Sequence, residues 1–490
     1  MVFPVVGGDG KPTGYEIDNS LRFNDADNAH LEKTFSGSPT STTKCTMSFW
    51  IKTGNLLSTS ARAIFSAIKS GSNEDVIKFG SSNGGNLGYL EFNFNNTNDG
   101  AMMPGNTTAL ITFRDPSAWY NFVIAIDTTQ GSAEDRLKFY VNGTLQEVEA
   151  SISGGNLQAD TEMAQNYDLG FLTASKHQIG MNVESSNSEP FDGYLSEFYF
   201  VDGQQYAPTV FAETDDNGVW IPKDAKDDIS FGNYGFYMEF KQTGTSANSS
   251  GMGADTSGND NHFAASGLTT LDVTTDTPTN NFCTLNPLYK QGSPTFSEGN
   301  CKVVLPAGDG SQGAAGNIAP ANGKWYWEVK QGSATNSSIL VREASDKEDD
   351  LSYYQGNFAA YVFNNGNQNI TGNTNSTYGP SYSSGDIIMV AMDMDNDRVY
   401  FGKNGSWIDG EGNADEANIN DFVPLNGVTN GLGAFANANG SATATAEFNW
   451  GNPSFSISSG NSDANGYGNF EYAVPSGYYA LCTKNLAEYG

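Results

Sequence analysis

The chain has 490 residues, of which 38% are hydrophobic and only 16% are charged. This length suggests about three domains, and the apolar content excludes a wholly disordered chain. The 56 Asp and Glu residues outnumber the 24 Lys and Arg residues, so the net charge is −32. Such a surface repels phosphates, which excludes nucleic acid as an expected partner.

The sequence carries no expected membrane segment, because no apolar run approaches the ~18 residues that a spanning helix needs. Residues 1–13 lack the basic region and the apolar core of a signal peptide, and we interpret them as an N-terminal arm. Gly, Ser, Thr and Asn supply most of the polarity, as in exposed adhesins. A virion protein, assembled in the host cytoplasm and exposed on the released particle, would reconcile these features.

The first half of the chain predicts strands rather than helices. Apolar residues alternate with polar ones, and Gly, Asn and Ser clusters separate the runs. The clearest runs are TMSFWIKT (46–53), WYNFVIAID (119–127) and RLKFYVNG (136–143). Many short strands with such turns predict β-sandwiches.

One pair of carboxylates near the N-terminus raises the question of glycoside hydrolysis, which needs two carboxylates in a cleft. YEIDNS places Glu16 and Asp18 two residues apart, as on one strand face. The lectin-fold β-glucanases carry a third carboxylate nearby, but Asn19 and Ser20 follow here. We therefore interpret the segment as the entry to a strand and expect no enzyme.

Residues 207–285 are rich in turns and are predicted to be a connector. Trp220, in NGVWIP, is predicted to wedge between domains, and with Tyr234 it is also a candidate aromatic platform for a sugar. In GADTSGNDNHF, the side chains of Asp255, Asn259 and Asp260 could bind calcium through oxygen atoms. Turn chemistry explains the same residues, and we favour the turn.

The stretch MDMDNDRVYFGKNGSW (392–407) begins like a calcium-binding EF-hand loop and ends like a hairpin turn. An EF-hand needs Gly at loop position 6 and Glu at position 12, where this chain has Arg398 and Asn404. We therefore predict a corner between two strands. Trp407 follows the N-G turn, so we expect it to be exposed and, with Asn404, to be a candidate glycan contact.

An internal repeat relates this stretch to the first half of the chain. FVIAIDTTQGSAEDRLKFYVNGT (122–144) aligns with IMVAMDMDNDRVYFGKNGS (388–406). The alignment pairs Asp127 with Asp393, and Asp135–Arg136 with Asp397–Arg398. The two loops differ in length while the strands keep their pattern, as hairpins permit. The chain therefore carries two similar sandwiches.

These motifs resemble known families. TMSFWIKT, DRLKFYVNGTL and FDGYLSEFYFVDGQQ are similar to the laminin-G/concanavalin-like family and delimit a sandwich at 14–206. GKWYWEVKQG and YGPSYSSGDIIMVAMDMDNDRVYFGKNG resemble the SPRY family and delimit a second sandwich at 286–490. Both families imply jelly rolls. The predicted fold is therefore all-β, with two concanavalin-like jelly-roll sandwiches joined by a β-rich, loop-rich connector.

The four cysteines are far apart in the sequence. Cys45 lies in a predicted strand and Cys482 near the C-terminus, and we favour buried thiols over disulfides. Cys283 and Cys301 are close enough in sequence to leave a disulfide open as an alternative.

The order of the segments, with the C-terminal GYYALCTKNLAEYG, resembles virion proteins of marine bacteriophages, of the tail-fibre or head-surface type. That resemblance implies a non-enzymatic structural protein on the particle, with lectin-like loops that contact host-surface glycans or other virion proteins. The alternatives are a receptor-binding tail-fibre adhesin and, less favoured, a polysaccharide depolymerase. We expect a homo-oligomer and no cofactor, unless calcium binds.

Overall fold

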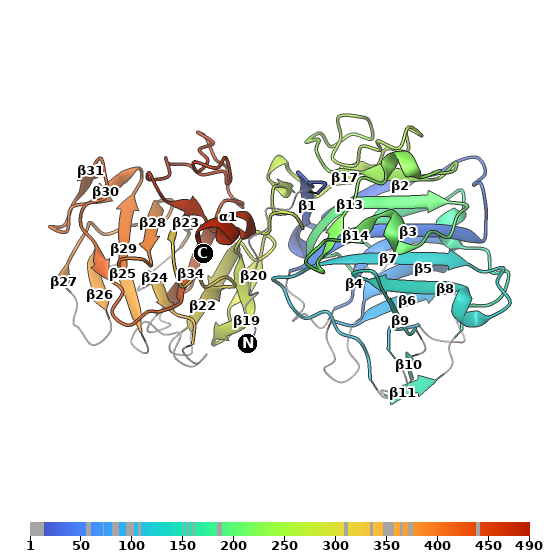
Figure 1. Ribbon diagram of the computed structural model, residues 1–490, viewed down its shortest axis with the longest axis horizontal. Helices are drawn as coiled ribbons and strands as arrows, with labels where there is room; N and C mark the ends of the chain where they lie inside the picture. Colours follow the sequence, from blue (N-terminus) through green and yellow to red (C-terminus); the bar gives the residue numbers. More distant parts are fainter. Residues whose placement is uncertain are drawn as a thin grey trace. The chain divides into compact units, whose positions relative to one another are not determined.

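The protein is described from a computed structural model, which covers residues 14–54, 60–71, 73–80, 88–94, 102–105, 109–148, 150–153, 156–159, 162–183, 189–307, 312–333, 337–345, 357–362, 366–370, 376–437 and 442–490. The chain forms two compact units (Figure 1). The N-terminal unit ends at Thr279, and the C-terminal unit begins at Asn280.

The described part of the N-terminal unit contains two large antiparallel sheets. The eight-stranded sheet consists of β18 (Val273–Thr274), β1 (Ser20–Phe23), β13 (Gly193–Asp202), β3 (Lys44–Thr53), β7 (Trp119–Asp127), β8 (Leu137–Val141) and β9 (Thr144–Gln146) in this order, with β16 (Phe236–Met238) paired to β13. The six-stranded sheet consists of β17 (Ala264–Ser266), β2 (His30–Thr34), β12 (Lys176–Ile179), β4 (Arg62–Ser70), β5 (Asn73–Phe79) and β6 (Leu90–Phe94).

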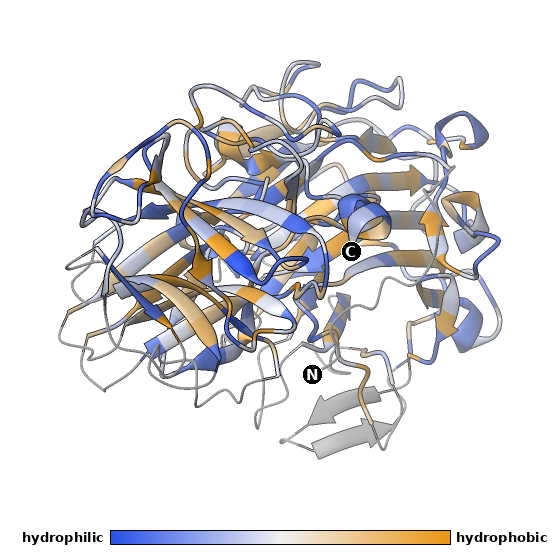
Figure 2. Ribbon diagram, turned by 60° about the vertical axis from the view of Figure 1, so that its left-hand side comes forward, coloured by the Kyte–Doolittle hydropathy of each residue, from blue (hydrophilic) through white to orange (hydrophobic). Residues whose placement is uncertain are grey.

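One hydrophobic core belongs to both sheets of this unit. Phe49 of β3 lies opposite Phe122 of β7, which in turn lies opposite Val141 of β8. These residues share a core cluster with Ile77 and Phe92 of the six-stranded sheet. The predicted alternation is thus confirmed, and Figure 2 shows hydrophobic and hydrophilic positions changing along the strands.

Most of the predicted connector, as far as Thr279, is part of the N-terminal unit. Phe211, Ala225 and Phe231 pack on Val123 and Val201, on the face of the eight-stranded sheet that points away from the core. The strands β17 and β18 extend the two sheets. Two short ribbons complete the described strands of the unit: β10 (Ala150–Ser153) with β11 (Asn156–Ala159), and β14 (Ala212–Thr214) with β15 (Trp220–Pro222).

The C-terminal unit repeats the two-sheet plan. Its seven-stranded sheet consists of β19 (Leu285–Gln291), β22 (Gln312–Gly316), β33 (Gly431–Asn437), β24 (Ser337–Glu343), β25 (Phe358–Val362), β26 (Asn367–Ile370) and β27 (Ser376–Thr377). Its ten-stranded sheet consists of β20 (Thr295–Ser297), β21 (Lys302–Leu305), β34 (Ala444–Asn449), β23 (Lys324–Gln331), β28 (Ile387–Asp393), β29 (Arg398–Lys403), β30 (Ser406–Ile408) and β31 (Ala414–Glu416), with β32 (Val423–Pro424) paired to β29 and β35 (Tyr479–Ala480) to β23.

The repeat predicted from the sequence is visible in the strand order. The neighbours β13, β3, β7 and β8 of one unit correspond to β34, β23, β28 and β29 of the other. Trp325, Trp327 and Val390 lie in the core of the C-terminal unit, together with Ile339 of the seven-stranded sheet. The all-β fold with two sandwiches is therefore confirmed.

Helical segments are short in the part of the chain that is described. They are α1 (Thr483–Tyr489) and the 3-10 helices η1 (Asp25–Asp27), η2 (Ala133–Asp135), η3 (Gly170–Leu172), η4 (Pro208–Val210), η5 (Lys226–Asp228) and η6 (Thr270–Asp272). None of these described helices has the length and apolar character needed to cross a membrane.

All four cysteines are buried thiols that form no disulfide. The alternative of a disulfide between Cys283 and Cys301 is therefore wrong for this structure. The Cys301 thiol instead donates to the backbone oxygen of Asn452, at 3.5 Å.

Candidate functional site

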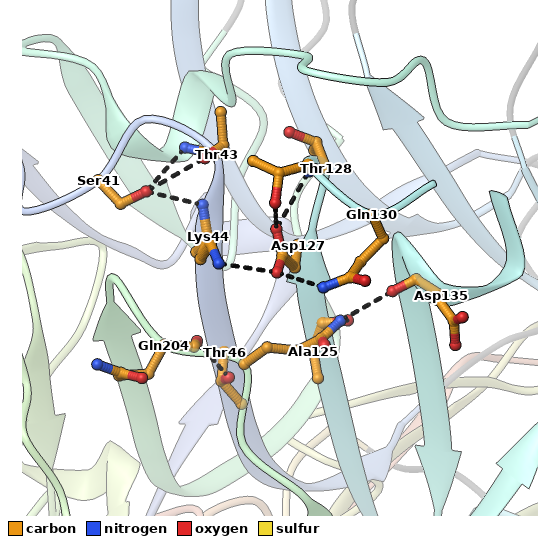
Figure 3. A network of polar contacts seen from close by, with 12 residues as sticks. Ser41, Thr43, Lys44, Thr46, Ala125, Asp127, Thr128, Gln130, Asp135 and Gln204 are labelled. Atoms are coloured by element: carbon orange, nitrogen blue, oxygen red, sulfur yellow. Dashed lines mark hydrogen bonds and ion pairs between the residues drawn. The ribbon is translucent and has the colours of Figure 1, made fainter. Parts of the chain in front are cut away.

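The two hairpin corners of the repeat are built around an aspartate and a lysine. In the N-terminal unit, Asp127 ends β7 opposite Lys44, and Lys44 Nζ lies 2.9 Å from Asp127 Oδ2 (Figure 3). Thr129 and Gln130 also donate hydrogen bonds to this carboxylate. Burial raises the pKa of Asp127, but the hydrogen bonds from Thr129, Lys44 and Gln130 prevail and lower it to about 2.

The D-x-D-x-D stretch forms the matching corner of the C-terminal unit. Asp393 ends β28 opposite Lys324, and Lys324 Nζ lies 2.9 Å from Asp393 Oδ2. Asn396 donates to the same carboxylate, while Asp395 accepts from the backbone N–H of Gly323. The hairpin between β28 and β29 confirms our interpretation of this stretch as a strand corner.

The side chain of Asn404, a predicted glycan contact, is already hydrogen-bonded within the turn between β29 and β30. Asn404 and Gly405 have φ values of 50° and 93°, the left-handed pair of a type I′ turn. The Asn404 side chain accepts from the N–H of Ile387 at 2.9 Å and donates to Asp386 at 2.7 Å. Asn142 accepts from the N–H of Asn121 in the same way at the other N-G turn.

The expectation that Trp407 is exposed is wrong, because only 6% of its surface remains accessible. It lies opposite Gly402 across the turn, and its ring contacts Tyr326 edge to face, with centroids 6.5 Å apart. Phe470 and Tyr478, from the C-terminal segment, belong to the same buried cluster. In this conformation Trp407 has no open face for a sugar.

The other two predicted platforms also make internal contacts. The Tyr234 side chain is 2% exposed, stacks on Phe35 and donates its hydroxyl to the backbone oxygen of Gly37. Trp220 is half-buried, covers Gly143, and donates from Nε1 to Asn121 Oδ1 at 3.0 Å. Both contacts lie within the N-terminal unit, so they do not support the prediction that Trp220 is an inter-domain wedge.

The proposed calcium loop is held by hydrogen bonds. The buried carboxylate of Asp255 accepts from the N–H groups of Tyr237, Ser257 and Asn261. Asn259 donates its amide to two backbone carbonyls, and Asp260 is exposed. These are the contacts expected of the favoured turn, and no cluster of three or more His, Cys, Asp or Glu side chains suited to a metal occurs in the described residues.

The six-stranded sheet carries a polar cluster on its outward face that the sequence analysis missed. We call Glu74, Lys78, Glu91, Asn182 and Glu189 the face cluster. Lys78 Nζ lies 3.0 Å from Glu189 Oε1 and 4.0 Å from Glu91 Oε2. The Asn182 amide donates to Glu74 and to Glu189, at 2.9 Å each.

Strand register explains how these side chains meet. Lys78 of β5 lies directly opposite Glu91 of β6. Glu74 shares the face of Lys78 because side chains alternate along a strand. Asn182 and Glu189 come from the segment after β12, and the N–H of Ala63 in β4 donates to the backbone oxygen of Glu189.

The electrostatics of the face cluster are set by its partial burial. Burial raises the pKa of Glu91, and the charge of Lys78 and the hydroxyl of Tyr89 only partly offset this effect. The partly exposed carboxylates and the ammonium group can donate and accept hydrogen bonds, whereas the Asn182 amide is 3% exposed and holds Glu74 and Glu189 in position. Such an array suits the vicinal hydroxyls of a sugar.

The alternation in NEDVIKF and LEFNF was the available signal for this cluster. The alternation places Glu74 and Lys78 on the same face of β5, and it places Glu91 on one face of the next strand, β6. The pairing of the two strands, and the approach of Asn182 and Glu189, were not available from the sequence.

Each unit is thus a two-sheet sandwich, and the N-terminal one carries a polar cluster on its outward face. A family of known proteins matches each of the two sandwiches. The family described as the concanavalin A-like lectin/glucanases superfamily matches residues 25–211, and the SPRY domain family matches residues 324–436. The chain therefore contains a concanavalin A-like domain and a SPRY domain, as the sequence resemblance predicted.

Solved structures similar to parts of the chain include SPRY domains and a putative carbohydrate binding protein. The SPRY domain of human HERC1 is 16% identical, covering 34% of this chain and 96% of its own, with a TM-score of 0.28. The TRIM65 PSpry domain is 12% identical, with coverages of 34% and 92% and a TM-score of 0.27. A putative carbohydrate binding protein from Bacteroides ovatus is 19% identical, with coverages of 38% and 44% and a TM-score of 0.25. The comparison with curated proteins found no match.

Proposed function

We propose that this chain is a non-enzymatic glycan-binding protein on the surface of a bacteriophage particle. The face cluster is the observation that carries the glycan-binding part of the proposal. Lys78, Glu189 and Asn182 are positioned by one another before any ligand arrives. Such preorganisation reduces the entropy cost of binding.

The acidic composition supports the virion part of the proposal. A net charge of −32 keeps a protein soluble and monodisperse in salty water. The order of the two sandwiches and the turn-rich segments, which resembles marine phage virion proteins, supports the same role. Many copies on one particle would convert weak single contacts into strong attachment.

A glycan array with the full chain tests the binding part. Asn182→Ala removes the amide that links Glu74 and Glu189, and we expect it to weaken binding of neutral glycans about tenfold, or 1.4 kcal/mol. Asn259→Ala, in the turn-rich loop, serves as the control. If the wild-type chain binds no glycan, or if Asn182→Ala binds as tightly as the wild type, the face cluster is not the binding site.

Two further measurements test the virion assignment and the non-enzymatic assignment. The protein should co-purify with intact particles and be visible on their surface by cryo-electron microscopy. Its absence from purified particles would refute the virion assignment. Release of reducing ends from a host polysaccharide, abolished by Glu91→Gln, would refute the non-enzymatic assignment.

A further inference from the structure

An exposed arginine lies beside an exposed phenylalanine on the ten-stranded sheet. Arg398 begins β29, and its guanidinium carbon lies 4.3 Å from the centroid of the Phe422 ring. Phe422 immediately precedes β32 and keeps 41% of its surface exposed. Tyr400, two residues along β29 from Arg398, also contacts Phe422, with ring centroids 6.2 Å apart and ring planes at 63°.

The guanidinium of Arg398 is available to a ligand. Within the described ranges it makes no hydrogen bond or ion pair with another residue. Asp393 lies directly opposite Arg398, but Lys324 and Asn396 already occupy the carboxylate of Asp393. The arginine therefore stacks on Phe422 instead of closing an ion pair across the strands.

The internal repeat provides a matched comparison. Arg136 follows the other corner, where its backbone oxygen accepts from the N–H of Asp127. Its guanidinium donates to three backbone oxygens, those of Gln130, Gly131 and Met163, at 2.8–2.9 Å. Arg136 thus holds a loop, whereas Arg398, at the equivalent position, is left without such acceptors.

We propose that Arg398 and Phe422 bind the uronic acid residues of an acidic polysaccharide. The carboxylate of the sugar accepts two N–H groups from the guanidinium, a bidentate contact that lysine cannot reproduce. The C–H face of the sugar packs against the exposed part of the Phe422 ring. This inference goes beyond the proposed function, because it places a second site, for an acidic glycan, in the C-terminal unit.

The strand pairing around the site favours a sugar over an acidic peptide. The strand β29 is paired with β28 on one side and with β30 and β32 on the other. No backbone edge is therefore open at Arg398 for an added peptide strand. A ligand at this place interacts with side chains alone, and a rigid ring with one carboxylate fulfils both contacts.

Calorimetry with oligogalacturonate tests the proposal, using the full chain at 0.15 M salt. At this ionic strength the Debye length is about 8 Å, so distant surface carboxylates are screened, whereas Asp397 and Asp421, which adjoin Arg398 and Phe422 in the sequence, still repel an anion and should make binding salt-dependent. Arg398→Gln and Phe422→Ala change exposed side chains, and thermal unfolding verifies that both variants are folded. Lys226→Gln, which removes a positive charge from the N-terminal unit, is the matched control.

We expect the wild-type chain to bind oligogalacturonate and to bind its methyl ester at least tenfold more weakly. Arg398→Gln and Phe422→Ala should each weaken oligogalacturonate binding at least tenfold, and Lys226→Gln should not. Equal binding by Arg398→Gln and the wild type would overturn the proposal. So would equal binding of polyglutamate, because the site would then accept an acidic peptide.

The outcomes also separate this site from the proposed function. Binding of neutral glycans that depends on Asn182, without binding of oligogalacturonate, would leave the proposed function standing and overturn the Arg398 site. Oligogalacturonate binding that depends on Arg398, in a protein absent from particles, would support the site and refute only the virion assignment.

Discussion

The N-terminal unit contains a buried carboxyl group whose protonation should control stability. Glu197 lies at a β-bulge in β13, with a left-handed φ of 51°, and is 5% exposed. The hydroxyls of Tyr15, Tyr199 and Tyr237 donate to its carboxylate at 3.0, 2.9 and 2.6 Å. Burial outweighs these three hydrogen bonds and raises the pKa of Glu197 from 4.5 to about 7.

The sign and size of the effect on stability follow from the difference between the pKa of Glu197 in the folded chain, about 7, and its ordinary value of 4.5. Between pH 4.5 and 7 the folded chain keeps a proton on Glu197 that the unfolded chain has released, so stability falls as the pH rises. A tenfold change in proton affinity is worth about 1.4 kcal/mol, so the full effect is about 3 kcal/mol. Glu197→Gln mimics the protonated group and should remove this loss.

Urea unfolding of the wild type and Glu197→Gln between pH 4 and 8 provides the measurement, with hydrogen exchange in β13 to assign the transition. Asp75 and His177 have shifted pKa values of about 6 and 4 in the same unit, so the two proteins are compared at each pH. The variant should gain about 3 kcal/mol relative to the wild type across this range. A difference that does not change with pH would refute the reasoning, and the exposed change Glu213→Gln is the control.

Three further predictions concern the repeat and its turns. Trp407→Ala should lower the free energy of unfolding by about 3–5 kcal/mol, because it empties a buried site, and should leave glycan binding by the remaining folded protein unchanged; loss of binding without loss of stability would contradict this. Asn404→Ala should cost about 1–2 kcal/mol in urea unfolding, and Asn404→Gly less, since glycine accepts the left-handed backbone; an equal cost for both variants would exclude backbone strain as the cause. Asp127→Ala should cost about 1–2 kcal/mol, because Thr129, Gln130 and Lys44 lose a charged acceptor but keep access to water, and a cost below about 0.5 kcal/mol would show that the corner is not held by this carboxylate.

Local patterns were enough to predict the sandwiches and their duplication. Alternation identified which residues of 119–127 point into the core, and the aligned aspartates identified the two hairpins. An EF-hand was correctly rejected at Asp393 because the required Gly and Glu are missing. These features depend on residues that are neighbours along the chain.

The exposure of single side chains depended on distant segments. Trp407 follows a turn, which suggested exposure, but Phe470 and Tyr478 bury it. The sequence suggested that the Asn404 amide is available to a ligand, but in the structure its oxygen accepts a hydrogen bond from the N–H of Ile387. The face cluster depends on the register of β5 against β6 and on the segment after β12, and no pattern within one strand contains that information.

The late strands β17 and β18 have a consequence for synthesis of the protein. They pair with β2 and β1, whose other neighbours are β12 and β13. In a nascent chain that has emerged only to residue 211, β1 and β2 are therefore paired on one side only, and their open edges are templates for association with other chains. The strands β17 and β18, of three and two residues, replace these edges by shorter ones, so a fragment that ends with the concanavalin A-like match should aggregate more readily than one that ends at Thr279.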